Sequence, residues 1–203
     1  MKKWLLMVLL AVSGAANAAI ELGKDYTLLS TPQPVANPKK VEVIEFFSYH
    51  CIHCYDDDPA FQAWAGKLPA DVSFRKEQIV WQKSMEGFAR MFATFNATGT
   101  FDKLHRPAFD AQIKQRIDLS NPEQFTKWVK LQKGVDSGKL LQTYNSFGIN
   151  AQVARATKIT RDYQIQGTPT VIVNGKYVVT TSTPERMIVV MNELIAKARS
   201  EKK

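Results

Sequence analysis

The chain has 203 residues, of which 45% are hydrophobic and 23% charged, and its formal net charge is +8 at pH 7. This length suits one domain with an insertion and a sizeable core, so the fold does not depend on disulfide staples. Basic and acidic residues are interspersed, without a basic stripe or a nucleic-acid motif, so we expect no nucleic-acid partner.

Residues 1–18 predict a cleaved secretory signal peptide. Lys2 and Lys3 precede an apolar stretch at 4–12, and the small-residue sequence Ala-Asn-Ala follows at 16–18. A charged start, a short apolar stretch and small residues before the cut are typical of such peptides. The apolar stretch is far shorter than the roughly 20 residues that span a bilayer, which makes an uncleaved anchor the weaker interpretation.

Both cysteines of the chain lie where a predicted strand passes into a predicted helix. Residues 41–47 are rich in β-branched and aromatic side chains and predict the strand. The helix is expected to begin at or near Cys51, with acidic residues 56–58 in its early turns, where the helix dipole favours negative charge. Pro59 lacks an N–H and should bend this helix. Residues 72–80 predict the next strand.

Helical character dominates residues 81–164. Phe88 and Phe92 begin an apolar repeat at helical spacing, and Asn121 before Pro122 is typical of a capped helix start. Because strands interleave with helices on either side of this stretch, the sequence predicts one α/β domain interrupted by a helical insertion.

A hairpin and a helix are predicted near the C-terminus. Residues 170–173 and 176–179 favour strands and flank Asn174-Gly175, whose residue types accept the positive φ of a tight hairpin turn. Thr183 can cap a final helix that carries an apolar stripe. The stripe comprises Met187, Ile188, Met191, Leu194, Ile195 and Ala198.

The cysteine pair, together with Thr168-Pro169 just before the hairpin, resembles the thioredoxin superfamily. The fuller patterns EFFSYHCIHCY and QGTPTVIVNGKY, with the helical insertion, resemble the DsbA family of bacterial periplasmic thiol:disulfide oxidoreductases. The likeness covers nearly the whole mature chain. It implies a thioredoxin-like domain at 19–80 and 165–203, with an all-helical domain inserted at 81–164.

The chemistry of such a dithiol depends on the ionisation of Cys51, because only a thiolate attacks or leaves readily in disulfide exchange. We expect the helix N-terminus and His53 to stabilise this thiolate, and Cys54 to be more buried. In DsbA the corresponding thiol has a pKa of about 3.5, which favours the reduced form by about 5 kcal/mol. The resemblance therefore implies an enzyme that donates its disulfide, although Ile52 stands where the commonest family pattern has proline.

Glu45 is an unusual residue for its position. It lies in a strand expected to be buried on both faces, where burial without a partner would raise the pKa of a carboxyl group. Lys76, on the neighbouring predicted strand, matches a family lysine and can pair with it. Two roles stay open for Glu45: proton exchange near Cys54, or a structural ion pair.

Further site residues come from the resemblance. It implies a cis bond between Thr168 and Pro169, which would present the backbone of Thr168 beside Cys51 for an extended substrate segment to pair with. Without the resemblance, an ordinary trans proline is expected. His50 either lines the site or caps the turn, and His105 is expected to be a surface or packing residue.

The resemblance also implies partners. The substrates would be reduced, unfolded exported proteins in the periplasm, and a DsbB-like quinone-linked membrane oxidase would reoxidise the dithiol. We expect a monomer without a cofactor.

Two other functions stay open as alternatives. A disulfide isomerase or reductase of the same superfamily is the closer alternative, although the roughly 22 residues between the predicted cleavage site and the first core strand are too few for an isomerase's dimerisation domain. The other is a copper or zinc carrier, but four ligands within five residues fit a tetrahedral zinc site poorly, so no metal is expected. Its ligands would be Cys51, Cys54, His50 and His53.

Overall fold

The computed structural model of the protein describes residues 20–202, so the predicted signal peptide lies outside the described residues. Within them, five strands form one sheet in the order β1-β5-β4-β2-β3. Strands β2 and β3 run parallel, and the other neighbouring pairs are antiparallel. The strands are β1 (Tyr26–Leu28), β2 (Val41–Phe47), β3 (Val72–Gln78), β4 (Thr170–Val173) and β5 (Tyr177–Val179).

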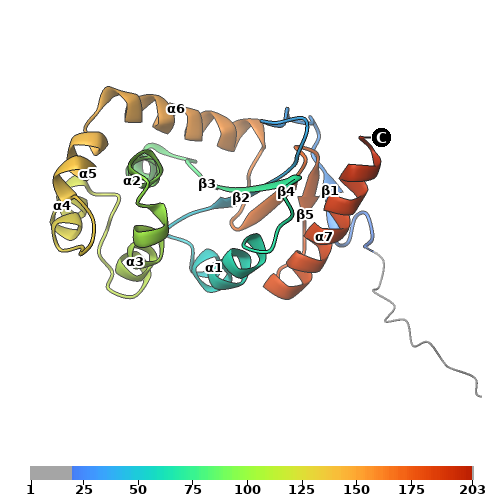
Figure 1. Ribbon diagram of the computed structural model, residues 1–203, viewed down its shortest axis with the longest axis horizontal. Coiled ribbons are helices and arrows are strands. Elements are labelled where there is room, and N and C mark those ends of the chain that lie inside the picture. The colour runs from blue at the N-terminus through green and yellow to red at the C-terminus, as the bar shows by residue number, and fades with distance from the viewer. Residues whose placement is uncertain (1–19, 203) are drawn as a thin grey trace, which may run out of the picture.

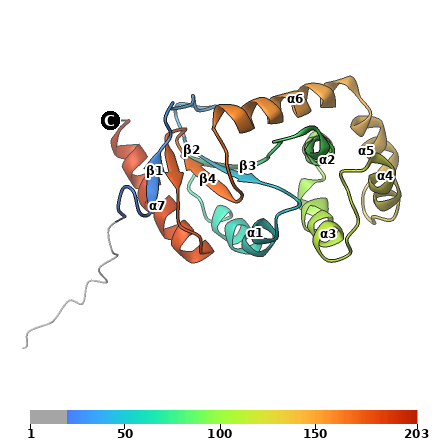
Figure 2. The ribbon, with the colours of Figure 1, turned by 180° about the vertical axis from the view of Figure 1, so that it is seen from behind.

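Helices cover both faces of this sheet, as Figures 1 and 2 show. Helices α1 (Ile52–Ala65) and α7 (Pro184–Ser200) lie against one face, and α6 (Phe147–Asp162) runs across the other. The remaining helices gather at one end of the sheet, between β3 and β4 in the chain. They are η1 (Lys83–Met85), α2 (Glu86–Thr98), α3 (Phe101–Ile113), α4 (Pro122–Lys130) and α5 (Ser137–Tyr144). The α/β architecture with inserted helices agrees with the sequence, and the domain boundaries at 81 and 164 stay a prediction.

Strand β2 lies inside the sheet, and all seven of its residues are buried. It matches the predicted strand residue for residue. Its parallel partner β3 ends at Gln78, two residues earlier than predicted, because the N–H of Val80 donates to the hydroxyl of Thr160 in α6 at 3.0 Å. The sequence did not predict β1, which has three residues and pairs with β5.

The predicted hairpin and final helix are confirmed. Asn174 and Gly175 join β4 to β5 with φ angles of 53° and 63°. Thr183 caps α7 by accepting from the N–H of Arg186. The predicted stripe of α7 packs against the sheet, with Ile188 partly buried and the others buried. Local sequence signals therefore suffice for this end of the fold.

Helix α1 continues through Pro59 to Ala65, and the bend expected at this residue stays a prediction. Proline leaves the carbonyl of Tyr55 without a helical donor. Arg106 of α3 supplies one: its Nη1 donates to that oxygen at 2.7 Å, and its guanidinium lies 3.6 Å from the centre of the Tyr55 ring. The Tyr55 hydroxyl in turn donates to Asp110 at 2.8 Å. These contacts hold α3 against the helix that carries both cysteines.

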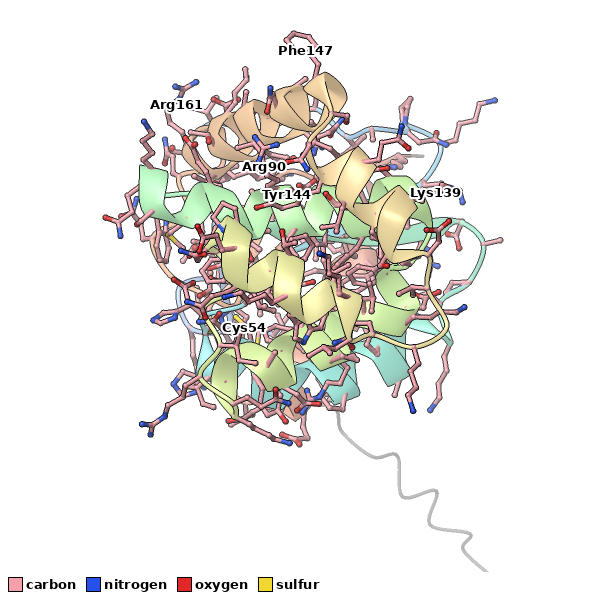
Figure 3. The ribbon with its side chains drawn as sticks, turned by 90° about the vertical axis from the view of Figure 1, so that its left-hand side faces the viewer. Cys54, Arg90, Lys139, Tyr144, Phe147 and Arg161 are labelled. Atoms are coloured by element: carbon pink, nitrogen blue, oxygen red, sulfur yellow. The ribbon has the colours of Figure 1, made fainter. Side chains whose placement is uncertain are left out.

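The inserted helices share a hydrophobic core with the cysteine-bearing turn. This core runs from Phe47, Tyr49 and Cys54 into side chains of α2 to α5. At its outer end Arg90 of α2 donates to the carbonyl of Tyr144 at 2.9 Å and lies 5.5 Å from that ring (Figure 3). Because one core spans both parts, the inserted helices support the position of the cysteines.

Candidate active site

Cys51 occupies the N-cap of α1, as the sequence predicted for the start of this helix. Its Sγ accepts a hydrogen bond from the N–H of Cys54 at 3.1 Å and lies 3.3 Å from the carbonyl oxygen of Thr168. Cys51 is half-buried, whereas Cys54 is fully buried, and both are free cysteines. The geometry leaves one sulfur within reach of a substrate and hides the other.

The two thiols differ in acidity. A hydrogen bond with the Cys54 side chain is the largest influence on Cys51, and with smaller contributions from Thr168, the Cys54 N–H and His53 it lowers the pKa of Cys51 to about 6 against the effect of partial burial. Burial is the main cause that raises the pKa of Cys54. The helix N-terminus and His53 therefore act in the predicted direction, but the neighbouring thiol contributes more. The pKa of Cys51 lies above the roughly 3.5 that the resemblance implied.

The Thr168–Pro169 peptide bond is cis, as the resemblance implied. Both residues are partly buried, and the contact between the Thr168 carbonyl and Cys51 Sγ brings this loop to the cysteine although 117 positions separate them in sequence. The backbone of Thr168 therefore lies beside the more accessible sulfur.

Glu45 and Lys76 are direct neighbours in the parallel register of β2 and β3. Their side chains form a short ion pair, and both are buried. Burial is the largest influence on Glu45 and raises the pKa of its carboxyl group despite the attraction of Lys76. The charge of Glu45 is among the causes that raise the pKa of Cys54, so the carboxyl group lies within electrostatic reach of that thiol. The structure therefore brings together three of the predicted site residues: Glu45, Lys76 and Cys54.

Three residues that sequence reasoning missed extend this pair. Lys76 Nζ also lies 3.0 Å from Asp58 Oδ1, and Nε2 of His105 lies 3.1 Å from the same oxygen. Nδ1 of His105 lies 2.7 Å from the hydroxyl of Tyr49, in the turn before Cys51. His105 is 3% exposed, so its expected surface role is wrong, while packing is only part of its environment. The sequence did contain a signal for the burial of His105, because this residue lies four positions from both Phe101 and Phe109 and so on the same helix face as they do.

His50 and His53 are both exposed at the mouth of this site. Nδ1 of His50 lies 3.4 Å from the side-chain amide of Gln112 in α3, and its N–H donates to the Ser48 hydroxyl at 3.2 Å. His53 adds a favourable charge to the environment of Cys51. Neither histidine joins the buried network.

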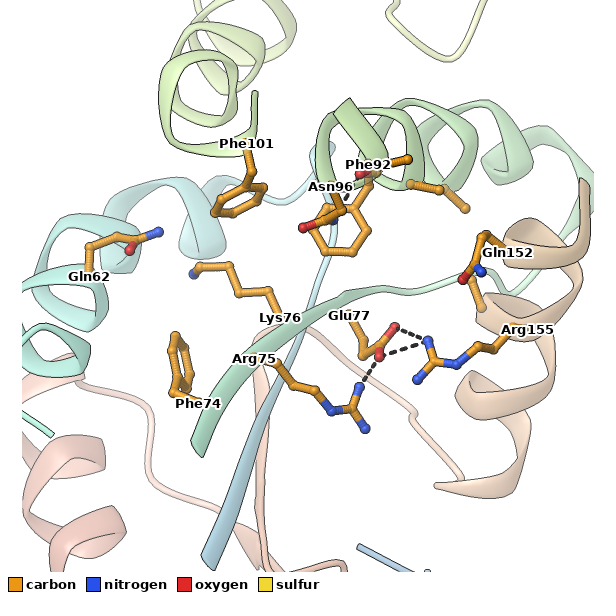
Figure 4. Close-up of a pocket in the computed structure, with 14 residues that line it drawn as sticks. Gln62, Phe74, Arg75, Lys76, Glu77, Phe92, Asn96, Phe101, Gln152 and Arg155 are labelled. Carbon is orange, nitrogen blue, oxygen red and sulfur yellow. Dashed lines mark hydrogen bonds and ion pairs between the residues drawn. The ribbon is translucent and has the colours of Figure 1, made fainter. Parts of the chain in front are cut away.

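A cavity of about 650 Å³ lies between β3, α2 and α6 and reaches Lys76 (Figure 4). Phe74, Phe92 and Phe101 line its apolar part. On its polar side Glu77 accepts hydrogen bonds from Arg75 and Arg155. Lys76, which pairs with Glu45, is therefore also one of the residues that line this cavity.

Among residues 20–202, no group of three or more His, Cys, Asp or Glu side chains is arranged to hold a metal ion. None of the helices in the same range has the length and apolar character needed to cross a membrane.

Known proteins share both the sequence pattern and the fold of this chain. The family model for the DSBA-like thioredoxin domain matches residues 60–189. The thiol:disulfide interchange protein DsbA of Azotobacter vinelandii is 39% identical over 186 residues, which cover 90% of this chain and 86% of the relative. The DsbA of Pseudomonas aeruginosa is 36% identical over 211 aligned residues that cover both chains completely. The crystal structure of reduced DsbA1 from Neisseria meningitidis superimposes with a TM-score of 0.85 at 37% identity, covering 91% of this chain and 98% of that one.

Proposed function

The chain belongs to the DSBA-like thioredoxin family and is a DsbA-like thiol:disulfide oxidoreductase; from this premise we propose that Cys51 and Cys54 form the disulfide that it donates to exported proteins in the periplasm. The observation that carries this assignment is the contrast between the two sulfurs. Cys51 is accessible and has a lowered pKa, whereas Cys54 is buried and has a raised one. A stabilised thiolate favours the reduced enzyme, so the oxidised enzyme tends to pass its disulfide on.

The reaction begins when a substrate thiolate attacks Cys51 Sγ of the oxidised enzyme. The Cys51–Cys54 bond breaks, a mixed disulfide forms between Cys51 and the substrate, and Cys54 leaves as a thiolate that takes up a proton. A second substrate thiolate then attacks the substrate sulfur of the mixed disulfide and releases Cys51 as a thiolate. The substrate loses two electrons, and the enzyme gains them as a dithiol.

Glu45 is well placed to supply the proton that Cys54 needs. Burial raises the pKa of its carboxyl group, which favours the protonated form, and it lies within electrostatic reach of the leaving thiolate. Its Oε1 is buried without a hydrogen-bond partner among the described residues, which leaves one oxygen available to carry that proton. The proton passes from this carboxyl group to the sulfur, and Lys76 then stabilises the carboxylate.

The loop that contains Thr168 and Pro169 is the substrate-binding element in this proposal. An extended substrate segment can pair with the Thr168 backbone as an added strand. A cavity of about 380 Å³ beside this loop is lined by Trp81 and Ile165, among others, and Trp81 is 49% exposed. Ile52, also exposed, adds apolar surface next to Cys51. Such surface suits unfolded chains, whose apolar side chains are accessible. His50, exposed before Cys51, completes the proposed contact area.

Reoxidation requires an electron acceptor outside the chain. In the proposed cycle a DsbB-like quinone-linked membrane oxidase takes the two electrons and restores the Cys51–Cys54 disulfide. Export by the signal peptide at residues 1–18 would bring the mature protein, expected as a monomer without a cofactor, to the compartment of both partners.

Cysteine variants test the assignment directly. In an assay that follows oxidation of a reduced, unfolded test protein by the oxidised enzyme, Cys51→Ser is expected to abolish turnover. Mixed with a test protein that already contains a disulfide, Cys54→Ser should instead accumulate a mixed disulfide, detectable by non-reducing gel electrophoresis, because its Cys51 thiolate attacks that disulfide and no second enzyme thiol can then release Cys51. Retained turnover in Cys51→Ser would contradict the assignment.

The direction of the reaction needs a separate measurement. Equilibration of the wild-type dithiol with glutathione buffers gives its reduction potential, and we expect a value more oxidising than the roughly −270 mV of thioredoxin. A value at or below that of thioredoxin would indicate a reductant and exclude the donor role.

A further inference from the structure

A continuous line of buried polar side chains connects the turn before Cys51 to the carboxyl group of Glu45, which influences the pKa of Cys54. It runs from the Tyr49 hydroxyl through His105 and Asp58 to Lys76 and ends at Glu45. All five residues are at most 8% exposed. Phe101 stacks on the His105 ring with 4.3 Å between the ring centres, and it also lines the cavity that reaches Lys76. The established activity assigns no role to the His105 end of this line.

The hydrogen-bond directions in this line follow from elementary chemistry. Asp58 is ionised: burial acts against this, but the hydrogen bond from His105 and the charge of Lys76 prevail and lower its pKa to about 2. A carboxylate can only accept, so Nε2 of His105 must donate to it. Burial lowers the pKa of His105 and keeps the ring neutral, so its Nδ1 is an acceptor and the Tyr49 O–H donates. Tyr49 therefore fixes the tautomer that His105 presents to Asp58.

The charges in this cluster are unequal in number. Lys76 is one ammonium between two carboxyl groups; burial opposes its charge, but Glu45 and Asp58 together raise its pKa. Asp57 of α1 adds a further negative charge near Glu45. Cys54, on the same helix, lies within electrostatic reach of Glu45. On the other side, Arg106 Nη1 lies 4.0 Å from Asp58 Oδ2. One ammonium needs only one carboxylate as a counterion, so the proton is held by whichever carboxyl group is less well stabilised as an anion.

We propose that His105 is a positioning residue for the exchange reaction: by donating to Asp58, it makes Asp58 the fixed counterion of Lys76 and leaves the proton on Glu45. This inference rests on the proposed role of Glu45 as proton donor to Cys54. In the step itself the O–H bond of Glu45 breaks and the S–H bond of Cys54 forms, while Lys76 and His105 keep their protons and Asp58 stays ionised. His105 touches none of the reacting atoms and acts through Asp58 and Lys76.

The two amide side chains give a matched pair of variants. In His105→Gln the side-chain amide can reach the place of Nε2 and still donate to Asp58, whereas in His105→Asn the amide corresponds to Nδ1 and does not reach it. The proposal expects His105→Asn to lower the apparent midpoint of Glu45 protonation by about one pH unit or more, a tenfold loss of proton affinity. His105→Gln should remain within a few tenths of a unit of wild type. The midpoint is read in the reduced protein from the infrared carbonyl band of the protonated carboxyl group, identified by its loss in Glu45→Gln.

A kinetic cycle links this shift to the reaction. The rate at which Cys54 is released from the oxidised enzyme by a small dithiol is measured against pH for wild type, His105→Asn, Glu45→Gln and the double variant. We expect His105→Asn to shift the profile to lower pH by the same amount as the infrared midpoint, and to have no such effect in the Glu45→Gln background. A shift that persists without Glu45, or an infrared midpoint that is equal in the Gln and Asn variants, overturns the proposal.

Tyr49→Phe provides a second route if His105→Asn does not fold. It removes only the O–H that fixes the tautomer, so a smaller shift in the same direction is expected, and an unchanged midpoint counts against the proposal. The infrared measurement needs no substrate. Failure of the wild-type protein to oxidise a reduced test protein would therefore contradict the proposed function, and is distinguishable from failure of the His105 inference.

Discussion

The buried charge of Asp58 should make a measurable contribution to the stability of the reduced protein. Its carboxyl group has a pKa of about 2, against an ordinary value of 3.8, because the His105 hydrogen bond and the Lys76 ammonium outweigh burial. A difference of nearly two units corresponds to about 2 kcal/mol of unfolding free energy at neutral pH. Asp58→Asn removes the charge but keeps the size of the side chain and an acceptor oxygen for His105.

The pH dependence of this contribution follows from its sign. Because folding lowers the pKa of Asp58, the folded state is favoured when the group is ionised in both states, which holds above about pH 4. The contribution is lost as the pH falls from about 4 through 2, where the native carboxylate takes up its proton. The difference between wild type and Asp58→Asn should therefore be about 2 kcal/mol at pH 7 and should shrink towards zero near pH 2.

Urea unfolding of the reduced proteins, followed by circular dichroism at a series of pH values from 7 to 2, measures this difference. With a urea dependence of about 2 kcal/mol per molar, typical for small domains, the midpoint at pH 7 should fall by about 1 M. Asp56→Asn is the matched control, because Asp56 lies on the same helix and is exposed. If the unfolding free energies of wild type and Asp58→Asn differ by the same amount at pH 7 and pH 3, the difference does not come from ionisation of Asp58, and the reasoning is refuted.

Three further predictions concern single residues. The thiolate absorbance of reduced protein should titrate with a midpoint near the Cys51 pKa of about 6, and a midpoint above 8 would contradict the described environment of that thiol. Gly87→Ala should lower the unfolding free energy by about 1–3 kcal/mol in denaturant unfolding, since its Cβ would lie 2.0 Å from the backbone oxygen of Ser120. Gly148→Ala is the control, because its nearest neighbour would be 4.0 Å away; equal effects would exclude the close approach as the cause. Arg106→Met keeps an apolar stem but leaves a carbonyl of α1 without a donor, so a loss of about 1–3 kcal/mol is expected, and no loss would show that water replaces the guanidinium.

Local sequence signals predicted much of the scaffold. The strand at 41–47 and the Asn174-Gly175 hairpin depend on backbone preferences of neighbouring residues, which are the same in any fold. The cap at Thr183 is local in the same sense. In contrast β1 was not predicted, because a three-residue strand carries too little pattern of its own and exists through its pairing with β5.

The candidate site likewise has a part that the sequence predicted and a part that it did not. Cys51 and Cys54 could be recognised from their spacing and from the strand and helix around them, and the pairing of Glu45 with Lys76 followed from the expectation of adjacent strands. The contact between Asp58 and His105 could not be predicted, since 47 positions separate the two residues and nothing in the sequence gives the distance between α1 and α3. The same holds for Arg106, which satisfies the carbonyl that Pro59 leaves free.

By itself, then, the sequence determined the spacing of the two cysteines, their place at a helix N-terminus and most of the elements around them, because these depend on residues close together in the chain. Only the tertiary structure decided how acidic each sulfur is and which buried ionisable groups contact one another. Those properties depend on burial and on charges brought within a few ångströms from distant parts of the chain, which local propensities do not encode.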